Sequence, residues 1–477
     1  MVLKVGTIGL GEQTGHSQEQ IVAGIANKFR MRPTDIEQYI KSQENVTGFA
    51  RGGSESLVLF VTPPQVVVRK IWSEKLLSAK WDSNGRGVMS SPLEKAKLQV
   101  DYLQNLPDPV KPYFPIIYDF REISVYDVDA DGMPVEKHAL ICDQSYLPGI
   151  EVSTFVERYQ PAPQVVAHIY REILRCLKEK IHPQRKKRRD CPTIEASYLR
   201  KIAKRLEIAQ QTAPRTFTSL ITSDYLWIDS KRYRNIAQLL DAFSQPDWQD
   251  ILEPQYHSLV MGDTNTENIK LTNPDVLLTA MQQDRLDLTY EDLGIRFLDP
   301  RAIGFNSVGA KVVDDYMYDN KPLHNSLGNY DVIHGEHFMI HTATEQGEPH
   351  ITLQHQEHHP FREPYRNIDQ YFPYIMGGWG IDDPEFSRND PYWLIRFTFI
   401  MGTHFAAMPP FHLKKECNGQ VRDEYDPQKR AVAVYCEGIK WLNLAHDMLT
   451  GERKELYGVS VPPLPKRARE RVISHLS

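Results

Sequence analysis

The chain has 477 residues, of which 41% are hydrophobic and 25% are charged. This composition is that of an ordinary soluble globular protein, and the length suffices for about two to four domains or for one large two-lobed enzyme. Lys and Arg number 56 against 62 Asp and Glu, giving a formal charge of −6, which argues against a nucleic-acid coat protein. The five cysteines form no CxxC pair, so we expect a reducing compartment and no disulfide framework.

Two features of the chain favour a cytoplasmic protein with no membrane partner. The N-terminal "MVLKVGTIGLGEQTGHSQEQ" lacks a sustained apolar region, which argues against a signal peptide. The most apolar segment, "WLIRFTFIMGTHFAAM", is interrupted by Arg396 and His404, so we expect a buried helix there and not a membrane span.

Residues 1–45 are expected to form an N-terminal helical extension, with helical patterns near residues 17–29 and 33–42. The glycine-rich "GTIGLGEQTG" has some likeness to a dinucleotide-binding loop. It lacks the surrounding strand–helix–strand unit and an acidic ribose partner, so a plain turn is the better interpretation.

From residue 46 onward the pattern becomes β. The segment "RGGSESLVLFV" predicts a turn and a strand, "QVVVRKIW" a second strand, and "PLEKAKLQVDYLQNLP" a helix. Further strands are expected in "YFPIIYDF" and "HALICDQSYLPGIEVSTF". Residues 46–148 are therefore predicted to form a small antiparallel sheet that carries one helix.

Residues 149–477 are predicted to be mostly helical, which makes the whole chain α+β. The segment "PQVVAHIYREILRCLKEKI" places its apolar residues on one helical face. Between two helices the basic "QRKKRRD" is expected to be a solvated loop, because the chain as a whole is acidic. Short β-type runs are expected around residues 259–271 and 295–298.

Two apolar runs end in an aspartate, and these carry the chemistry that the sequence suggests. In "LVMGDTNTENIKL" Asp263 is followed after four residues by Asn268, and "RFLDPRAIGF" contains Asp299. Phosphoryl transfer needs a group that orients and deprotonates the acceptor hydroxyl, oxygen ligands for Mg²⁺, and a cation for the nucleotide phosphates. Asp263 can serve as the first, and Asn268 and Asp299 as the metal ligands.

The cation and the loop that covers the nucleotide are expected in the N-terminal sheet. Lys70 in "VVVRKI" is the predicted phosphate contact, with Arg69 as the alternative, because neighbours on a strand face opposite ways. The turn formed by Gly52, Gly53 and Ser54 is the predicted phosphate-covering loop. A glycine pair before a strand is also what an ordinary turn requires.

Taken together, these motifs resemble the protein-kinase-like fold of the aminoglycoside and choline phosphotransferases. They are closest to bacterial small-molecule kinases of capsule and cell-surface polysaccharide pathways. The family's catalytic loop, H-G-D-x-x-x-x-N, is similar to "MGDTNTEN", and its I-D-P-R-G metal segment is similar to "LDPRA". Its Y-D-L-A-K-L-x-H-S-x-G-x-Y-D segment is similar to "YDNKPLHNSLGNYDVI". The resemblance extends over roughly residues 46–450.

The resemblance implies a bilobal fold, with an N-lobe over 46–148 and a helical C-lobe over 149–477 that holds the catalytic loop and the acceptor site. It implies ATP or GTP with Mg²⁺ as cofactors, and a γ-phosphoryl transfer to a hydroxyl of a sugar, amino sugar or amino alcohol. Modified peptides stay open as acceptors, and no oligomeric state is implied. The side chain of Asp319 is expected to brace the backbone of the catalytic loop.

Departures from the family pattern leave a second interpretation open, a nucleotide-binding pseudokinase scaffold with weak or no catalysis. Met261 stands where the family has a histidine, and Ala302 replaces a glycine. The helix position whose glutamate pairs with the strand lysine holds Gln99 or Asp101, with Glu94 further back.

The histidine-rich "HITLQHQEHHPFREPY" raises a third possibility, a metallohydrolase with bound zinc. Its spacing fits no familiar zinc signature, and Pro360 breaks any helix that would organise the ligands. We therefore expect a solvated loop there.

Overall fold

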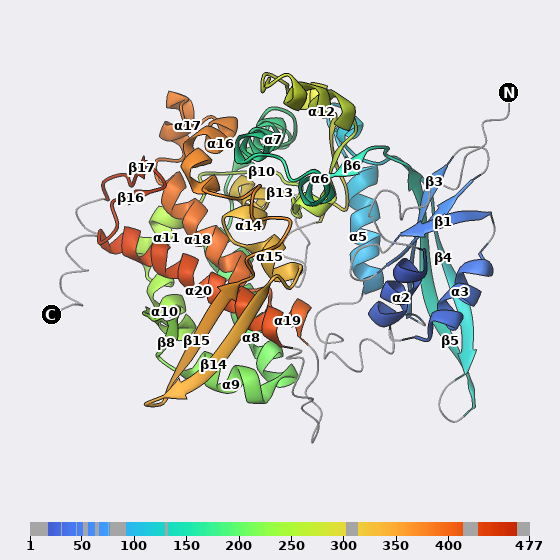
Figure 1. Ribbon diagram of the computed structural model, residues 1–477, viewed down its shortest axis with the longest axis horizontal. Helices are drawn as coiled ribbons and strands as arrows, with labels where there is room; N and C mark the ends of the chain where they lie inside the picture. Colours follow the sequence, from blue (N-terminus) through green and yellow to red (C-terminus); the bar gives the residue numbers. More distant parts are fainter. Residues whose placement is uncertain are drawn as a thin grey trace.

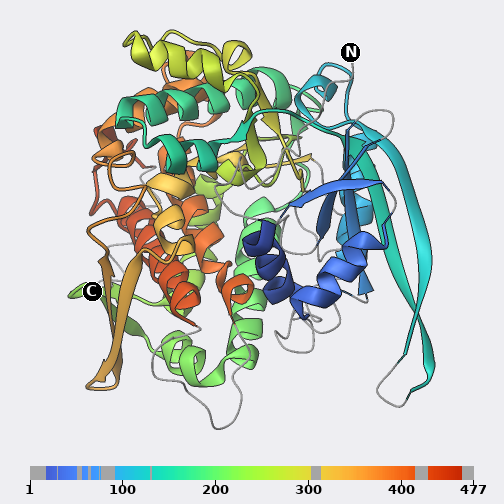
Figure 2. The ribbon, with the colours of Figure 1, turned by 45° about the vertical axis from the view of Figure 1, so that its right-hand side comes forward.

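A computed structural model describes residues 18–29, 31–43, 45–50, 56–62, 66–74, 76, 92–128, 132–301, 313–413 and 428–464. Within them the chain is α+β with small sheets, and the strand pairings are antiparallel apart from that of β15 with β8. The prediction of an α+β chain with small antiparallel sheets is confirmed to that extent. A five-stranded sheet lies at one end of the molecule and a mostly helical part at the other (Figures 1 and 2).

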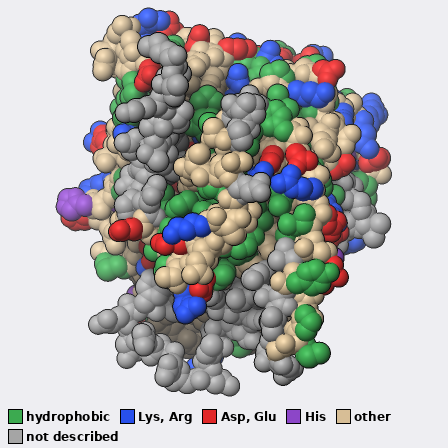
Figure 3. Space-filling model, turned by 90° about the vertical axis from the view of Figure 1, so that its right-hand side faces the viewer, with side chains coloured by type: hydrophobic (Ala, Val, Ile, Leu, Met, Phe, Trp, Pro, Cys, Tyr) green, Lys and Arg blue, Asp and Glu red, His purple; other side chains and the backbone are tan. Residues whose placement is uncertain are grey.

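The five-stranded sheet has the order β1-β2-β3-β5-β4 and is antiparallel throughout. Its strands are β1 (Val46–Ala50), β2 (Leu57–Val61), β3 (Val67–Ser73), β4 (Ile117–Val128) and β5 (Pro134–Ser145). Strands β4 and β5 form a long hairpin that extends away from the body of the molecule (Figure 2). Figure 3 views this end, where hydrophobic side chains reach the surface among charged ones.

Helices cover both faces of this sheet. Helix α5 (Pro92–Gln104) packs Leu93, Ala96 and Val100 against one face, together with Trp72 of β3. Helices α2 (Gln18–Phe29) and α3 (Pro33–Lys41) share a hydrophobic cluster with the side chains of the other face. The two N-terminal helices occur close to where the apolar periodicity predicted them, and they form a layer of the sheet structure.

The remaining described residues form mainly helices, with four small sheets among them. The helices are α6 (Val152–Tyr159), α7 (Pro163–Cys176), α8 (Arg200–Thr212), α9 (Pro214–Thr222), α10 (Ile236–Phe243), α11 (Pro246–Leu252), α12 (Pro274–Gln282), α13 (Tyr290–Leu293), α14 (Pro322–Ser326), α15 (Tyr330–His334), α16 (Phe372–Met376), α17 (Pro384–Asn389), α18 (Trp393–Ala406), α19 (Pro409–His412) and α20 (Lys429–Thr450).

These four small sheets have the orders β12-β11-β6, β13-β10-β7, β14-β15-β8-β9 and β16-β17. Their strands are β6 (Ile150–Glu151), β7 (Lys187–Arg188), β8 (Tyr225–Ile228), β9 (Lys231–Arg234), β10 (Tyr256–Leu259), β11 (Ile269–Leu271), β12 (Ile295–Phe297), β13 (Val313–Asp314), β14 (Phe338–Glu345), β15 (Glu348–His355), β16 (Glu455–Leu456) and β17 (Val459–Ser460). Single helical turns η5 (Thr266–Asn268) and η6 (Tyr316–Asp319) follow β10 and β13. Part of the histidine-rich segment, expected to be a loop, lies in strand β15.

Helices α18 and α20 lie side by side in the core of the helical part (Figure 1). Every residue of α18 is buried, as expected for the apolar segment that two polar residues interrupt. A Cβ atom added to Gly438 of α20 would lie 2.5 Å from the backbone nitrogen of Ala406. The glycine therefore lets the two backbones approach closely. No helix within the described residues has both the length and the apolar character needed to cross a membrane.

The close approach predicts the effect of Gly438→Ala. Alanine is intrinsically the better helix former by about 1 kcal/mol, but its methyl group would meet backbone atoms that cannot rotate away. We expect the overpacking to dominate and to lower the free energy of unfolding by about 1–3 kcal/mol. Urea unfolding measures the change, and an unaltered or raised midpoint would contradict the close packing of α18 on α20.

Candidate functional site

Asn268 and Asp299 emerge at the same edge of the β11–β12 pair. Strand β11 begins directly after Asn268, and β12 ends two residues before Asp299. The two strands are antiparallel with Ile269 opposite Phe297, so the start of one lies beside the end of the other. The amide of Leu298 donates a hydrogen bond of 2.7 Å to the carbonyl oxygen of Asn268. The two predicted metal ligands are therefore brought together by the ladder.

The loop that carries Asp263 lies against the chain just beyond Asp299. Gly262 has a φ of +77°, and a Cβ atom there would lie 2.0 Å from the carbonyl oxygen of Arg301, so this position requires glycine. The amide of Arg301 donates to the carbonyl of Met261 at 2.9 Å, and its Nε lies 3.0 Å from Oδ2 of Asp263. Asp263 and Asp299 thus belong to one compact site.

The side chain of Asn268 is oriented by the same loop. Its Nδ2 donates a hydrogen bond of 3.0 Å to the carbonyl oxygen of Asp263. Because an amide nitrogen donates and its oxygen accepts, this bond fixes which way the amide is turned and leaves Oδ1 as an oxygen donor for a cation. The residue is half-buried, whereas Asp263 is 4% exposed.

Lys70 reaches the site from the five-stranded sheet. Only 6% exposed, it donates a hydrogen bond from its ammonium group to Oδ1 of Asp299. Its neighbour Arg69 faces the other side of β3 and forms two hydrogen bonds of 2.7 Å with the carboxylate of Asp143. The alternation of the strand therefore directs Lys70 to Asp299 and Arg69 to Asp143.

Helix α5 contacts the site through its own side chains. Gln99 donates a hydrogen bond of 3.3 Å to the carbonyl oxygen of Pro300, next to Asp299. The sequence left open which residue of this helix pairs with Lys70, and in the structure the carboxylate paired with Lys70 is that of Asp299. The predicted phosphate-covering residues Gly52, Gly53 and Ser54 lie outside the described residues.

Asp319 of η6 holds the backbone of the loop that carries Asp263, the bracing that the family resemblance implied. Its carboxylate accepts hydrogen bonds from the amides of Met261, at 2.9 Å, and Gly262, at 2.7 Å. His182 approaches the same carboxylate at 3.0 Å. Thr264 donates to the backbone carbonyl of Asp319 at 2.9 Å. The chain is thereby held by Asp319 both before and after Asp263. No local sequence signal pointed to His182.

Two cations set the charge state of Asp263. Lys321 donates hydrogen bonds of 2.9 Å to Oδ1 of Asp263 and to the carbonyl of Gly262, and Arg301 approaches the other carboxylate oxygen. Burial raises the pKa of Asp263, but the charges of Arg301 and Lys321 outweigh burial and hold the pKa below its usual value. The carboxylate is therefore ionised and can accept a proton. Lys321 lies in the "YDNK" segment but was not among the predicted site residues.

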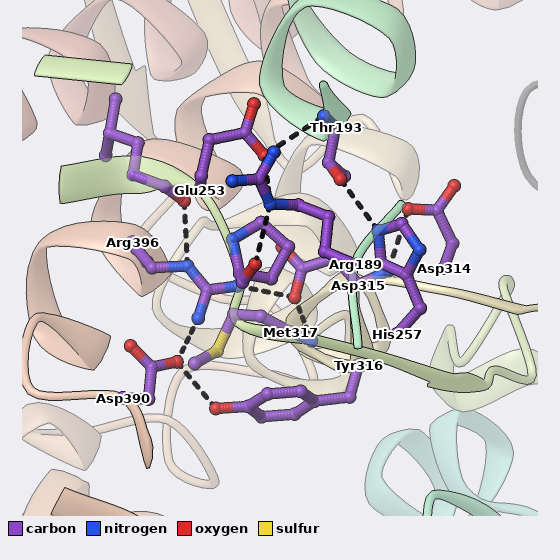
Figure 4. Close-up of polar contacts among 12 residues, drawn as sticks. Arg189, Thr193, Glu253, His257, Asp314, Asp315, Tyr316, Met317, Asp390 and Arg396 are labelled. Carbon is purple, nitrogen blue, oxygen red and sulfur yellow. Dashed lines mark hydrogen bonds and ion pairs between the residues drawn. The ribbon is translucent and has the colours of Figure 1, made fainter. Parts of the chain in front are cut away.

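A buried network anchors the segment that leads into η6 (Figure 4). Arg396 of α18, 1% exposed, donates to Oδ1 of Asp315 at 2.5 Å and also to Asp390. Tyr316 donates to the same carboxylate of Asp390 at 2.6 Å, and Asp315 accepts from the amide of Met317 at 3.0 Å. The support of Asp319 thus continues into the core helix.

A second group of possible metal ligands lies beside this network. One ligand atom each from Asp190, Cys191 and His257 fall within 4.8 Å of one another. Lys187 already lies 2.6 Å from Asp190, and His257 is hydrogen-bonded to Thr193 at 2.7 Å. All three residues have other partners in the structure, and a thiol with an imidazole suits a softer metal than Mg²⁺, so this donor set has no part in the site of Asn268 and Asp299.

Comparisons of the chain with protein-family models, with curated proteins and with solved structures each find no match. A functional assignment therefore rests on the chemistry of the site itself.

The network of Figure 4 predicts that Arg396 contributes strongly to the stability of the fold. Arg396→Met should lower the free energy of unfolding by about 3–5 kcal/mol, because it leaves two carboxylates buried without their cation. Chemical denaturation measures the loss. The matched control is Arg200→Met, which removes an exposed partner of Glu195 and should change stability by less than about 1 kcal/mol. Equal effects of the two substitutions would show that the network does not anchor η6.

Proposed function

We propose that the chain is a Mg²⁺-dependent phosphotransferase of the protein-kinase-like fold, which transfers the γ-phosphoryl group of ATP or GTP to a hydroxyl of a small molecule. In this proposal the five-stranded sheet is the smaller, nucleotide-binding lobe, and the mostly helical part is the larger lobe. The contact between Lys70 of the sheet and Asp299, beside Asp263 and Asn268, carries the proposal. These four residues, from two parts of the chain, can supply the three functions that phosphoryl transfer requires.

Asp263 has the properties of the group that receives the hydroxyl proton. It is buried, ionised and held by Lys321 and Arg301, so its carboxylate is fixed in place before an acceptor binds. As the acceptor oxygen bonds to the γ-phosphorus, its proton passes to Asp263, and the bond from phosphorus to the nucleoside diphosphate breaks. Placement and fixed charge supply most of the gain in such a reaction.

Asn268 and Asp299 fit a magnesium ion by the chemistry of their donors. The amide oxygen of Asn268 and the carboxylate of Asp299 are the hard oxygen ligands that Mg²⁺ prefers, and one or two carboxylates from the protein are the usual number. When bound, the ion would supply positive charge against the nucleotide phosphates. Lys70 would then bind the phosphates as a positive point charge.

Two observations favour the second candidate, a nucleotide-binding scaffold without turnover. Asp299 already has a cation partner in Lys70, and Met261 occupies the position before the Gly-Asp pair that holds histidine in the family. A scaffold of this kind would bind nucleotide while Lys70 and Asp299 stay paired.

Turnover of ATP in the presence of Mg²⁺ tests the proposal. We expect slow acceptor-independent hydrolysis that Asp299→Ala abolishes, and a loss of about 10²–10⁴-fold with Asp263→Asn, since a positioned base contributes that much. Release of inorganic phosphate is the measurement, with calorimetric binding of Mg·ATP alongside. Binding without turnover in the presence of any acceptor would establish the scaffold instead, and absence of Mg·ATP binding would exclude both candidates.

The two adjacent cations of β3 provide a matched pair of variants. Lys70→Met should raise the KM for ATP about 10- to 100-fold, the cost of a lost hydrogen bond to a charged group. Arg69→Met should leave this KM nearly unchanged and lower thermal stability, because its partner is Asp143 on the other face of the sheet. If Arg69→Met raised the KM and Lys70→Met did not, the assignment of the phosphate contact would be reversed.

A further inference from the structure

Two cations of helix α8 act on Tyr318, which lies in the same segment as Lys321, and neither has a role in the proposed function. Lys201 and Arg205 are one helical turn apart, so they project from the same face of α8. We refer to them as the α8 cations. Neither forms an ion pair with a carboxylate within the described part of the chain.

Tyr318 connects the α8 cations to the catalytic loop. The ammonium of Lys201 donates a hydrogen bond of 3.0 Å to the hydroxyl of Tyr318 and lies 4.5 Å from the centre of its ring. Lys321, which is bonded to Asp263, lies 5.1 Å from the centre of the same ring. Lys201 and Lys321 therefore contact the same aromatic ring, and Lys321 continues the chain of contacts to Asp263.

Arg205 is held in place by contacts that leave its charge uncompensated. One of its terminal nitrogens donates to the carbonyl of Ala407 at 3.2 Å, and its guanidinium lies 4.8 Å from the ring centre of Phe411. Its Nε is buried and has no hydrogen-bond partner among the described residues. A buried donor of this kind is costly unless something accepts from it.

The electrostatics of the cluster are those of a site built for negative charge. Lys201, Arg205 and Lys321 all act on Tyr318, and among the described residues Lys321 is paired with Asp263, which Arg301 also approaches. Burial lowers the pKa of both Lys201 and Arg205. Burial alone would raise the pKa of Tyr318, yet Lys201, Lys321 and Arg205 together lower it to about 8. Like charges gathered in a partly buried place cost free energy, and an anion bound among them would offset that cost.

Two neutral histidines complete the surroundings. His324 and His404 are buried with ring nitrogens 3.0 Å apart. Burial is the main reason why their pKa values lie well below the usual range, followed by Lys321 for His324 and by His324 and then Lys201 for His404. The ring of His404 packs edge-on against Tyr318 with centres 4.4 Å apart. Within the described residues its Nε2 has no hydrogen-bond partner, so it is a neutral group that can bond a hydroxyl.

From this cluster we infer that the acceptor of the proposed phosphotransferase carries an anionic group, a phosphate monoester or a carboxylate, besides the hydroxyl that is phosphorylated. The α8 cations bind that group while Asp263 binds the hydroxyl. This inference rests on the proposed function, and it narrows the acceptors: amino sugars and amino alcohols carry the same charge as the cluster and are repelled.

Direct binding to the full chain in the absence of nucleotide tests the inference. Four related probes are titrated by calorimetry: glucose, glucosamine, glucose 6-phosphate and glucuronate. We expect one or both anionic sugars to bind and the neutral and amino sugars to bind at least about ten-fold more weakly, since loss of a charged contact costs that much. The comparison of the two anions distinguishes a phosphate site from a carboxylate site. Binding should weaken as salt is raised.

Substitutions assign the binding to α8. The pair Lys201→Gln with Arg205→Gln should weaken anion binding about 10- to 100-fold. Arg205→Lys keeps the positive charge and should retain most of the anion binding. This variant covers the case in which the double variant folds poorly. The control is Lys204→Gln, which removes the same charge from an exposed position of the same helix and should change nothing.

Three results would overturn the inference: no binding of either anion at millimolar concentration, equal binding of glucosamine, or equal loss with Lys204→Gln. Turnover and binding of Mg·ATP are followed in parallel. If turnover and Mg·ATP binding are intact but anionic sugars bind no better than the neutral and amino sugars, only this inference is wrong. Failure to bind Mg·ATP would exclude the proposed function.

Discussion

The buried carboxylate of Asp319 is the constraint on which the site depends. By accepting from two successive backbone amides, at Met261 and Gly262, it fixes a turn whose left-handed glycine is required by the close approach of Arg301. Two backbone donors would otherwise be buried without partners, which is costly, so this carboxylate stabilises the fold and positions Asp263 at once. Arg396 extends the support by tying the segment before Asp319 to helix α18 (Figure 4). Stability of the helical core and geometry of the site are therefore not separable here.

Local features of the site were predictable because they leave a local trace in the sequence. An apolar run that ends in a Gly-Asp turn predicts a strand and a loop, and the α2 and α3 helices followed from apolar periodicity. Strand β14 was missed because most of its side chains are exposed, so it lacks the alternation by which a half-buried strand is recognised. Strand β15 does alternate buried and half-buried residues at its start, but its histidines were interpreted as part of a solvated loop. The choice between Lys70 and Arg69 could not be made either, since it depends on which face of β3 turns toward Asp299.

The α8 cations belong to the class of features that only tertiary structure shows. Lys201 and Arg205 read as ordinary charges on an amphipathic helix, and nothing in their spacing separates them from Lys204. What distinguishes them is the loop that returns with Tyr318 and Lys321 more than a hundred positions later and brings Asp263 with it. Contacts of such long sequence separation have no local signature. The same holds for His182, whose partner Asp319 is distant along the chain.

The ion pair of Lys70 and Asp299 links the binding of metal and of phosphates in the proposed nucleotide site. Both side chains are largely buried, so each compensates a charge that would be costly if left alone. A metal ion bound to Asp299 would leave the ammonium of Lys70 without its partner. Phosphates bound to Lys70 would likewise leave the carboxylate of Asp299 without its partner. Binding of metal and phosphates together satisfies both charges, whereas binding of either alone satisfies one. In the proposed phosphotransferase this pair therefore couples the binding of the metal ion to the binding of the phosphates. Asp299 has a φ of +49°, a conformation that only a well-supported loop sustains. Its carboxylate is therefore held where it can exchange Lys70 for the metal ion.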